Sequence, residues 1–361
     1  MEIFSADRIF TGLAWLPDHA ILEDEGIIVD VLPIVSLPPN SVREHFNMIT
    51  PAFIDAQIYG ASGKLFSAFP SVNSLDLLYK HCLKGGTHYF LPTVATNTLT
   101  IVKECIDAVK LYWKSGGKGV VGLHLEGPWI NKTKRGAHLE NLISVPDKAV
   151  VKDLLEYGAG VIKMITIAPE VCSTEVLEQL RSYNIVLSAG HSDATFSLAS
   201  ASFDKGIRAA THLFNAMSPL HHRNPGLPGA VFQHSQVCAS IIADGHHVDF
   251  AMISIAKTLL SERLFLITDA VTETSEGPYQ HTLEGDKYVC NGILSGSALM
   301  MIDAVKNCIS NAGISEEEAL RMATLYPARV LGIEDLGLIK KGYRAELVFM
   351  DKDWTVLSTA T

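Results

Sequence analysis

Four polar residues stand where buried strands are expected to end, and their types suit metal-assisted hydrolysis. Glu126 is the next-to-last residue of the run GVVGLHLEG, while His191 and His212 lie in IVLSAGHS and RAATHLFNA. One carboxylate and two imidazoles can hold a catalytic Zn²⁺ or a similar divalent ion and leave a coordination position open for water. Asp269, in RLFLITDA, could accept the proton of that water and return it to a leaving group. Together they predict one metal centre with a general base beside it.

Each of these residues alone is a weak signal, because a single histidine at a strand end is more often a hydrogen-bonded structural residue. Four such residues at four separate strand ends are harder to explain by packing. Burying a carboxylate and several imidazoles near one axis is costly unless a metal or tight pairing compensates. His124 lies two residues before Glu126 and faces the same way. It is a possible fourth ligand, but we expect it to support the ligands instead.

A strand followed by an amphipathic helix recurs along the chain and would place these residues at one edge. Near-continuous apolar strands alternating with helices indicate a parallel sheet covered on its outer face. Eight such units match a (β/α)8 barrel, in which catalytic residues lie at the strand ends. No GxGxxG follows the first strand, which disfavours an open nucleotide-binding sheet. The expected strands are 49–57, 87–96, 119–127, 161–170, 185–192, 208–216, 237–245 and 263–270.

The two ends of the chain have a different pattern. Residues 1–48 and 331–361 contain short β-like runs broken by Gly, Asp and Pro. We predict that they form one small β-sandwich domain, and that residues 49–330 form the barrel. Residues 272–297 are expected to be a long loop with a hairpin after the eighth strand.

Composition excludes several classes of function. The 361 residues are 48% hydrophobic and carry a formal charge of −10, with no block of Lys or Arg, so we expect no nucleic-acid partner. No apolar run is long enough to suggest a membrane span. The six cysteines are scattered and no secretory signal is visible. We therefore expect a cytoplasmic protein with reduced thiols.

Several longer segments identify a family. GLHLEGPWINKTKRGAH (122–138), SAGHSDAT (188–195), THLFNAMSPLHHRNPGLPGA (211–230), IIADGHHVDF (241–250), LITDAV (266–271) and LSGSALMMIDAVKN (294–307) resemble the N-acetylglucosamine-6-phosphate deacetylases of the amidohydrolase superfamily. The likeness runs from about residue 8 to residue 350, in order and with matching spacing. It implies a (β/α)8 barrel with a β-sandwich domain.

The resemblance implies roles for particular residues. Glu126, His191 and His212 would be the metal ligands, and Asp269 the general base and acid. His138 would bind the sugar and polarise the acetamide carbonyl, while Arg223 and His247 would meet the sugar and its phosphate. The other residues implied to line the substrate pocket are Gln57, Ala137, Asn215, Ala216, Asp244, Gly245, His246, Leu294, Ser295 and Gly296.

The first strand departs from the two-metal pattern. Two-metal members end this strand with His-x-His, whereas this chain has Gln57-Ile58-Tyr59. Gln57 resembles the residue found there in single-metal members, and its amide could contact the substrate. We expect one divalent ion per subunit, Zn²⁺ first and Fe²⁺ or another ion as alternatives.

The implied reaction removes the acetyl group from N-acetylglucosamine 6-phosphate, giving glucosamine 6-phosphate and acetate in amino-sugar catabolism. N-acetylgalactosamine 6-phosphate is an alternative substrate because the two sugars differ at one hydroxyl. A non-catalytic sugar-phosphate-binding protein is a further alternative, which the intact ligand set and Asp269 disfavour. Arg223 suits bidentate phosphate binding. By resemblance we expect a homodimer, with Arg223 and His247 near a shared phosphate site.

Overall fold

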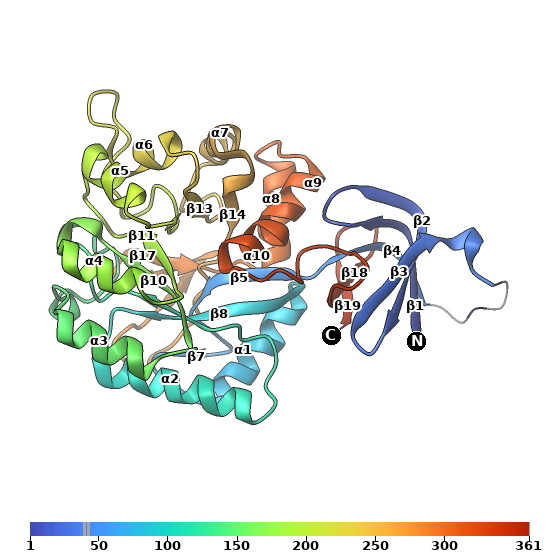
Figure 1. Cartoon of the computed structure of the whole chain (residues 1–361), viewed down its shortest axis with the longest axis horizontal. Coiled ribbons are helices and arrows are strands. Elements are labelled where there is room, and N and C mark those ends of the chain that lie inside the picture. Colours follow the sequence, from blue (N-terminus) through green and yellow to red (C-terminus); the bar gives the residue numbers. More distant parts are fainter. Residues whose placement is uncertain (39–40, 42–43, 361) are drawn as a thin grey trace.

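The computed structural model describes residues 1–38, 41 and 44–360. A large barrel surrounded by helices lies beside a smaller sheet that holds both chain termini (Figure 1). The small sheet has strands from both ends of the sequence, and the barrel is formed by the segment between them.

Eight parallel strands form the barrel and confirm the predicted fold class. Their order in the sheet is the reverse of their order in the chain, with each strand beside its sequence neighbour. The first and last strands meet through a parallel bridge between Ile58 and Ala270 and through the bond from the Asp269 N–H to the Gln57 carbonyl, 3.0 Å long. The strands are β5 (Phe53–Ile58), β8 (Thr87–Ala95), β9 (Leu123–Glu126), β10 (Ile162–Ile167), β11 (Val186–Ala189), β12 (Ala209–Ala210), β13 (Cys238–Ile241) and β14 (Leu264–Leu266).

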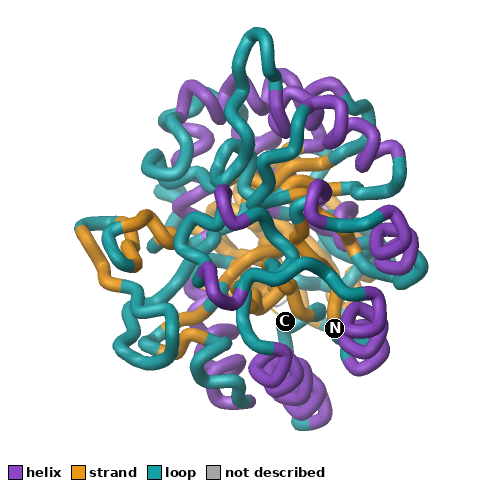
Figure 2. The backbone as a smooth tube through the Cα atoms, turned by 90° about the vertical axis from the view of Figure 1, so that its left-hand side faces the viewer, coloured by secondary structure: helices purple, strands orange, loops and turns teal. Residues whose placement is uncertain are grey.

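Helices cover the outer face of the barrel (Figure 2). Several begin at a side-chain cap, as where Ser71 and Thr98 accept backbone N–H groups at the starts of α1 and α2. Their apolar faces pack on strands that are themselves buried, such as β5 and β9. The helices are α1 (Val72–Lys84), α2 (Leu99–Lys114), α3 (Lys148–Tyr157), α4 (Thr174–Arg181), α5 (Phe196–Asp204), α6 (Gly226–Gln233), α7 (Phe250–Leu260), α8 (Met301–Ser310), α9 (Glu316–Ala323) and α10 (Leu325–Leu331).

The smaller sheet has six strands in the order β19-β18-β4-β1-β2-β3. It has its own apolar cluster, in which Phe4, Ile21, Ile49 and Phe349 are buried. The predicted division at residues 48/49 and 330/331 stays a prediction, and β4 continues past residue 48. Residues 39–40, 42–43 and 361 of that predicted domain lie outside the described residues. The strands are β1 (Glu2–Phe10), β2 (Trp15–Asp24), β3 (Ile27–Pro33), β4 (Glu44–Pro51), β18 (Leu347–Met350) and β19 (Val356–Ala360).

Two small sheets lie outside the barrel and the six-stranded sheet. The segment after β14 forms three antiparallel strands, β15 (Thr282–Glu284), β16 (Lys287–Cys290) and β17 (Ile293–Ser297). A short hairpin, β6 (Gly60–Ala61) with β7 (Lys64–Leu65), follows the first barrel strand. Among the described residues, no helix has both the length and the apolarity needed to cross a bilayer. All six cysteines are free thiols, and the cytoplasmic location stays a prediction.

Candidate metal centre

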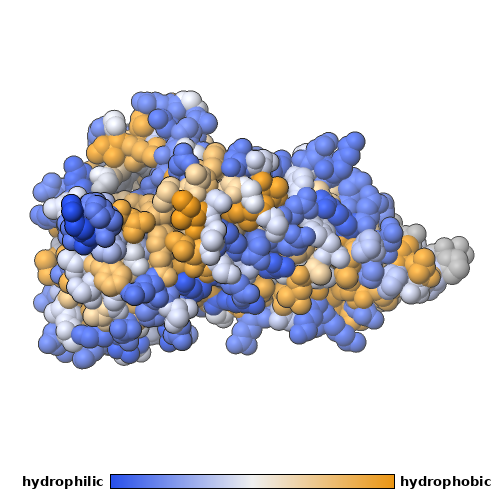
Figure 3. Space-filling model, turned by 90° about the horizontal axis from the view of Figure 1, so that it is seen from above, coloured by the Kyte–Doolittle hydropathy of each residue, from blue (hydrophilic) through white to orange (hydrophobic). Residues whose placement is uncertain are grey.

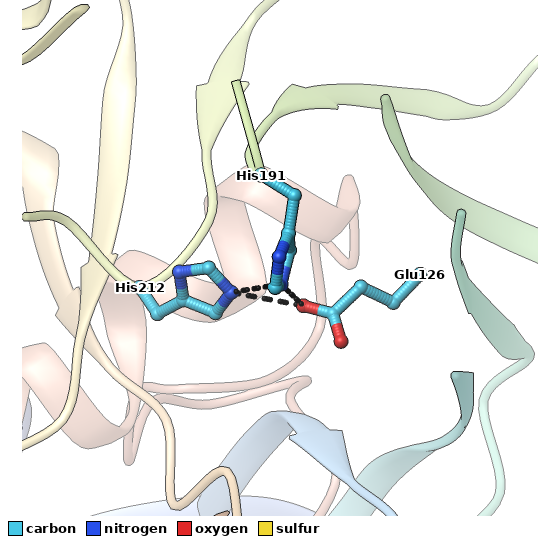
Figure 4. Close-up of side chains that lie close together, drawn as sticks. All are labelled: Glu126, His191 and His212. Atoms are coloured by element: carbon cyan, nitrogen blue, oxygen red, sulfur yellow. Dashed lines mark hydrogen bonds and ion pairs between the residues drawn. The ribbon is translucent and has the colours of Figure 1, made fainter. Parts of the chain in front are cut away.

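The three predicted metal ligands converge on one point inside the barrel mouth. Glu126 is the last residue of β9, while His191 and His212 each follow their strand by two residues. The His212 Nε2 atom lies 3.0 Å from both Glu126 Oε1 and His191 Nε2, and His191 Nε2 lies 3.4 Å from Glu126 Oε1. All three side chains are buried, and Figure 4 shows them pointing toward one another.

The chemistry of these donor atoms fits a divalent metal ion. The Nδ1 atom of His191 lies 2.9 Å from the Lys134 carbonyl. A carbonyl can only accept, so Nδ1 carries the proton of the neutral ring, and Nε2 presents a lone pair. Tetrahedral bonds of about 2.0–2.1 Å separate two ligands by roughly 3.3 Å, close to the spacing found here. The site therefore has the ligand types and spacing of a three-ligand Glu-His-His metal centre.

Electrostatics favours a charged carboxylate at the centre. Burial acts to raise the pKa of Glu126, but the rings of His191, His138 and His212 outweigh it, so this pKa lies well below its ordinary value. Burial lowers the pKa of His212. An anionic oxygen and neutral imidazole nitrogens are the protonation states that metal binding needs.

The backbone at these positions adopts an uncommon conformation. His191, His212 and Asp269 have positive φ angles of 47°, 39° and 54°. Residues with side chains rarely occupy this left-handed region, and they persist there only where the surrounding structure holds them. Gly127, directly after Glu126, has a φ of 85°, and a Cβ added to it would lie 2.2 Å from Thr96 Oγ1. The chain thus turns sharply at these strand ends and points the polar groups into the mouth.

Asp269 lies beside the ligands and is connected to them through Gln57. The Gln57 Nε2 atom donates to Asp269 Oδ1 at 2.7 Å and to Glu126 Oε1 at 2.9 Å. Burial raises the pKa of Asp269 well above its ordinary value, and the negative charges of Glu126 and Asp244 raise it further. A buried carboxylate with a raised pKa is a stronger base than an exposed one.

Gln57 lies behind the pocket wall. It was predicted to contact substrate, but its side chain is 1% exposed and does not line the cavity. Its amide instead holds two carboxylates in place. Tyr59 has a pocket position that sequence reasoning did not assign, and its hydroxyl donates to Glu126 Oε2. Burial raises the pKa of Tyr59 well above its usual value, and the charge of Glu126 raises it further.

His138 presents an N–H group to the same space. Its Nδ1 atom accepts from the Thr96 backbone N–H at 3.2 Å, so the proton of the neutral ring lies on Nε2. That Nε2 atom is 3.1 Å from Glu126 Oε2. Burial lowers the pKa of His138 to about 4. His138 is therefore a neutral donor near pH 7.

A cavity of about 170 Å³ lies over the metal centre. It is lined by Asp269, the three ligands and many of the predicted substrate residues: Ala137, His138, Asn215, Ala216, His247, Leu294, Ser295 and Gly296. Tyr59, Tyr279 and His281 are among the lining residues that were not predicted. The position of Tyr59, two residues after Gln57 on one strand, is a signal that could have indicated it. Tyr279 and His281 lie in the segment after β14, where no local pattern predicts that the chain folds over the mouth.

The remaining predicted residues lie at or beyond the rim. Asp244 Oδ2 binds His247 Nδ1 at 2.6 Å and so orients that ring toward the cavity. His246 turns outward to Asp286, 2.8 Å away. Gly245 lies between Asp244 and His246 in the chain and does not line the cavity. Arg223 is exposed on the loop that projects before α6 (Figure 1).

Two other candidates have structural roles. Both ring nitrogens of His124 are occupied, Nδ1 by the Ala56 carbonyl at 3.1 Å and Nε2 by Thr166 Oγ1 at 2.7 Å. His124 therefore does not join the ligand set. Asp55 accepts from the backbone N–H groups of Gln57 and Thr268, which joins the first barrel strand to the segment after the last. Burial raises the pKa of Asp55 to about 6.

Comparisons with known sequences agree with this site. The model of the amidohydrolase family matches residues 48–360. An N-acetylgalactosamine-6-phosphate deacetylase of Escherichia coli O157:H7 is 33% identical over 364 residues, covering 97% of this chain and 95% of that protein. An N-acetylglucosamine-6-phosphate deacetylase of Haemophilus influenzae is also 33% identical, with the same coverage. These two relatives, one named for each sugar, are thus equally similar to this chain.

Solved structures give the same result. An N-acetylglucosamine-6-phosphate deacetylase from Pasteurella multocida superimposes with a TM-score of 0.94 at 32% identity, covering 99% of this chain and 98% of that one. A mutant Mycobacterium smegmatis deacetylase in complex with N-acetyl-D-glucosamine-6-phosphate has a TM-score of 0.91 at 28% identity, covering 99% and 97%.

Proposed function

The chain belongs to the amidohydrolase family, and on that basis we propose that it hydrolyses N-acetylglucosamine 6-phosphate to glucosamine 6-phosphate and acetate. The observation that carries the proposal is the buried Glu126-His191-His212 cluster with Asp269 beside it under one cavity. Relatives named as N-acetylgalactosamine-6-phosphate deacetylases support that sugar phosphate as the second candidate substrate.

The ligand set would hold one divalent ion, with Zn²⁺ as the expected species. Such an ion supplies Lewis-acid polarisation of the acetamide carbonyl and acidifies a bound water. Asp269 takes a proton from the attacking water and then gives it to the departing amine nitrogen. His138 donates from Nε2 to the oxygen on which negative charge develops. Gln57 keeps Asp269 aligned through the 2.7 Å bond to Oδ1.

The sugar phosphate requires cations that the cavity does not contain. A phosphate monoester carries close to two negative charges near neutral pH. Among the described residues that line the cavity there are histidines but no lysine or arginine. His247, oriented by Asp244, is suited to one side of the phosphate. A second cation must therefore come from outside the lining.

We propose that Arg223 of a second subunit supplies the second cation for the phosphate, so that the active form is a homodimer. Arg223 is exposed and does not line the cavity of its own subunit. Large apolar side chains are exposed on the loop that bears Arg223 and on α7, which packs against α6: Leu220 is 46%, Ile255 47% and Leu259 50% accessible. Figure 3 looks down on this side of the molecule and shows apolar patches between polar ones. Burying these side chains would stabilise a dimer that brings each loop to its partner.

The test is acetate release from both acetamido-sugar 6-phosphates by protein of known metal content. We expect release that depends on the metal, with kcat/KM higher for the gluco sugar. The metal-stripped protein is the matched control. Metal-saturated protein that never releases acetate would refute the proposed reaction, and a higher kcat/KM for the galacto sugar would make that sugar the substrate. Light scattering measures the mass of the particle and so checks the dimer.

A further inference from the structure

We propose that Tyr59 is a positioning residue that holds the Glu126 carboxylate so that one oxygen faces the metal site. Tyr59 directly follows β5 and is 7% exposed. Its ring packs in a small apolar cluster with Leu65, Val271 and Tyr279. The ring is therefore anchored by packing, and the hydroxyl reaches the ligand side of the cavity.

The hydrogen bonds around Tyr59 can run in one direction only. One end of the Gln57 amide contacts Tyr59 Oη at 2.8 Å and also two carboxylate oxygens, of Glu126 and Asp269. Glu126 Oε1 belongs to a charged carboxylate and can only accept, so the atom that faces it is the amide nitrogen, whose two protons are shared among the three oxygens. The Tyr59 oxygen accepts from this nitrogen, and its own proton is directed to Glu126 Oε2.

This arrangement gives the two oxygens of Glu126 different tasks. Oε2 faces the donors Tyr59 and His138 Nε2, the latter at 3.1 Å. Oε1 faces the nitrogens of His191 and His212 at 3.4 and 3.0 Å. Rotating the carboxylate to offer both oxygens to a metal would break the Tyr59 bond. Tyr59 therefore favours binding through one oxygen and leaves the ion's other positions open.

His138 cannot replace Tyr59 in this task during the reaction. In the proposed function, the His138 Nε2 proton turns to the substrate oxygen, so Glu126 Oε2 loses that donor. Tyr59 has no other acceptor assigned and keeps Oε2 in place throughout. The inference rests on the proposed metal site, but it does not depend on which acyl sugar is cleaved.

The test measures metal affinity without turnover. Metal-stripped wild type and Tyr59→Phe are titrated with Zn²⁺ against a chromophoric chelator. Phenylalanine keeps the packed ring and removes the donor. We expect affinity to fall about 10- to 100-fold, the usual effect of losing a group that orients a metal ligand. Tyr279→Phe is the matched control, because that hydroxyl donates to the Thr96 carbonyl in the same pocket without touching Glu126. Its affinity should stay within about twofold of wild type.

A spectroscopic measurement makes the result independent of stability. Co²⁺ absorbs visible light more strongly with four ligands than with five or six. If Tyr59→Phe frees Glu126 to bind through both oxygens, the Co²⁺-loaded variant should absorb less than wild type, and Tyr279→Phe should not. Equal Zn²⁺ affinity and equal Co²⁺ spectra for wild type and Tyr59→Phe would overturn the inference. Wild type that binds no divalent ion would overturn this inference and the proposed function together. If wild type binds Zn²⁺ tightly and Tyr59→Phe binds it more weakly, but wild type releases no acetate, only the proposed reaction would be refuted.

Discussion

Replacing Asp269 with Asn separates proton transfer from metal binding. Asn has almost the same size, and its amide oxygen can still accept the 2.7 Å bond from Gln57 Nε2. The variant therefore keeps the geometry of the mouth and loses only the ability to take a proton. Neither Glu126 nor the two histidine ligands contact Asp269 directly in the described hydrogen bonds, so the metal content should remain that of wild type.

The expected loss of activity follows from the role of a positioned base. Such a group contributes about 10²- to 10⁴-fold to rate, which corresponds to roughly 3–5 kcal/mol in the activation barrier. The loss should appear in kcat at saturating sugar phosphate, because the base acts in the transition state. KM should change by a much smaller factor.

The same substitution should stabilise the metal-stripped protein at neutral pH. Burial and the charge of Glu126 raise the pKa of Asp269 above its unfolded value. A carboxyl group with a raised native pKa destabilises the fold as pH rises from its unfolded pKa to its native pKa, because the unfolded state releases a proton that the native state still holds. Asn carries no charge, so the variant should melt at a higher temperature than wild type at pH 7, and the difference should disappear below the unfolded pKa of about 3.8.

The assay combines metal analysis, acetate release and thermal melting on the same preparations. Full activity in Asp269→Asn would remove Asp269 as the base. Loss of metal together with activity would place Asp269 among the ligands instead. A lower melting temperature of the metal-stripped variant at pH 7 would contradict the reasoning about the buried charge.

Three further results are expected. A chelator should abolish acetate release and lower the melting temperature, because an ion present at a hundredfold excess over its Kd stabilises the native state by about 2.7 kcal/mol. Added Zn²⁺ should restore both activity and melting temperature. A chelated protein that stays active would contradict the metal centre. Arg223→Ala should raise KM for the sugar phosphate by about tenfold or more, and a larger factor on the unphosphorylated acetamido sugar would exclude a phosphate contact. Burial holds the pKa of His124 at about 4, below the unfolded value of about 6.5, so native stability on the order of 3 kcal/mol should be lost as pH falls from about 6.5 to about 4. Urea unfolding of metal-stripped His124→Gln should show a smaller difference between pH 7 and pH 4.5 than wild type, and an equal difference would assign the effect elsewhere.

The polar residues at the ends of the barrel strands were the part of the site that the sequence could predict. Glu126, His191 and His212 are far apart in the chain, yet each follows an apolar run, and parallel strands bring such positions to one edge. The structure places them within 4.8 Å of one another. The (β/α)8 fold was predictable for the same reason, because its units repeat in the sequence.

Contacts across the barrel seam were harder to predict. Gln57 was expected to touch substrate, but its direction depends on how β5 meets the segment after β14, and no local pattern encodes that meeting. In the sequence, Tyr59 was noted only because it replaces a metal-binding histidine. Its hydroxyl can also donate a hydrogen bond to Glu126, and the sequence pattern did not indicate that contact. Tyr279 lies in a segment whose path over the mouth is set by tertiary packing. The proposed contact between Arg223 and phosphate involves a second subunit, and the sequence of one chain does not encode that arrangement locally.

The seam between the first and last barrel strands also has a consequence for protein synthesis. Gln57 and Asp269 are separated by 212 positions in the chain, and ribosomes add about 5–20 residues per second. Between roughly 10 and 40 seconds therefore pass before the first of these residues can meet the second. A nascent chain that has emerged through His212 already carries Glu126, His191 and His212, but it lacks Asp269 and the last two barrel strands, β13 and β14. Truncated translation products should accordingly be inert toward acyl sugars even where they capture an ion.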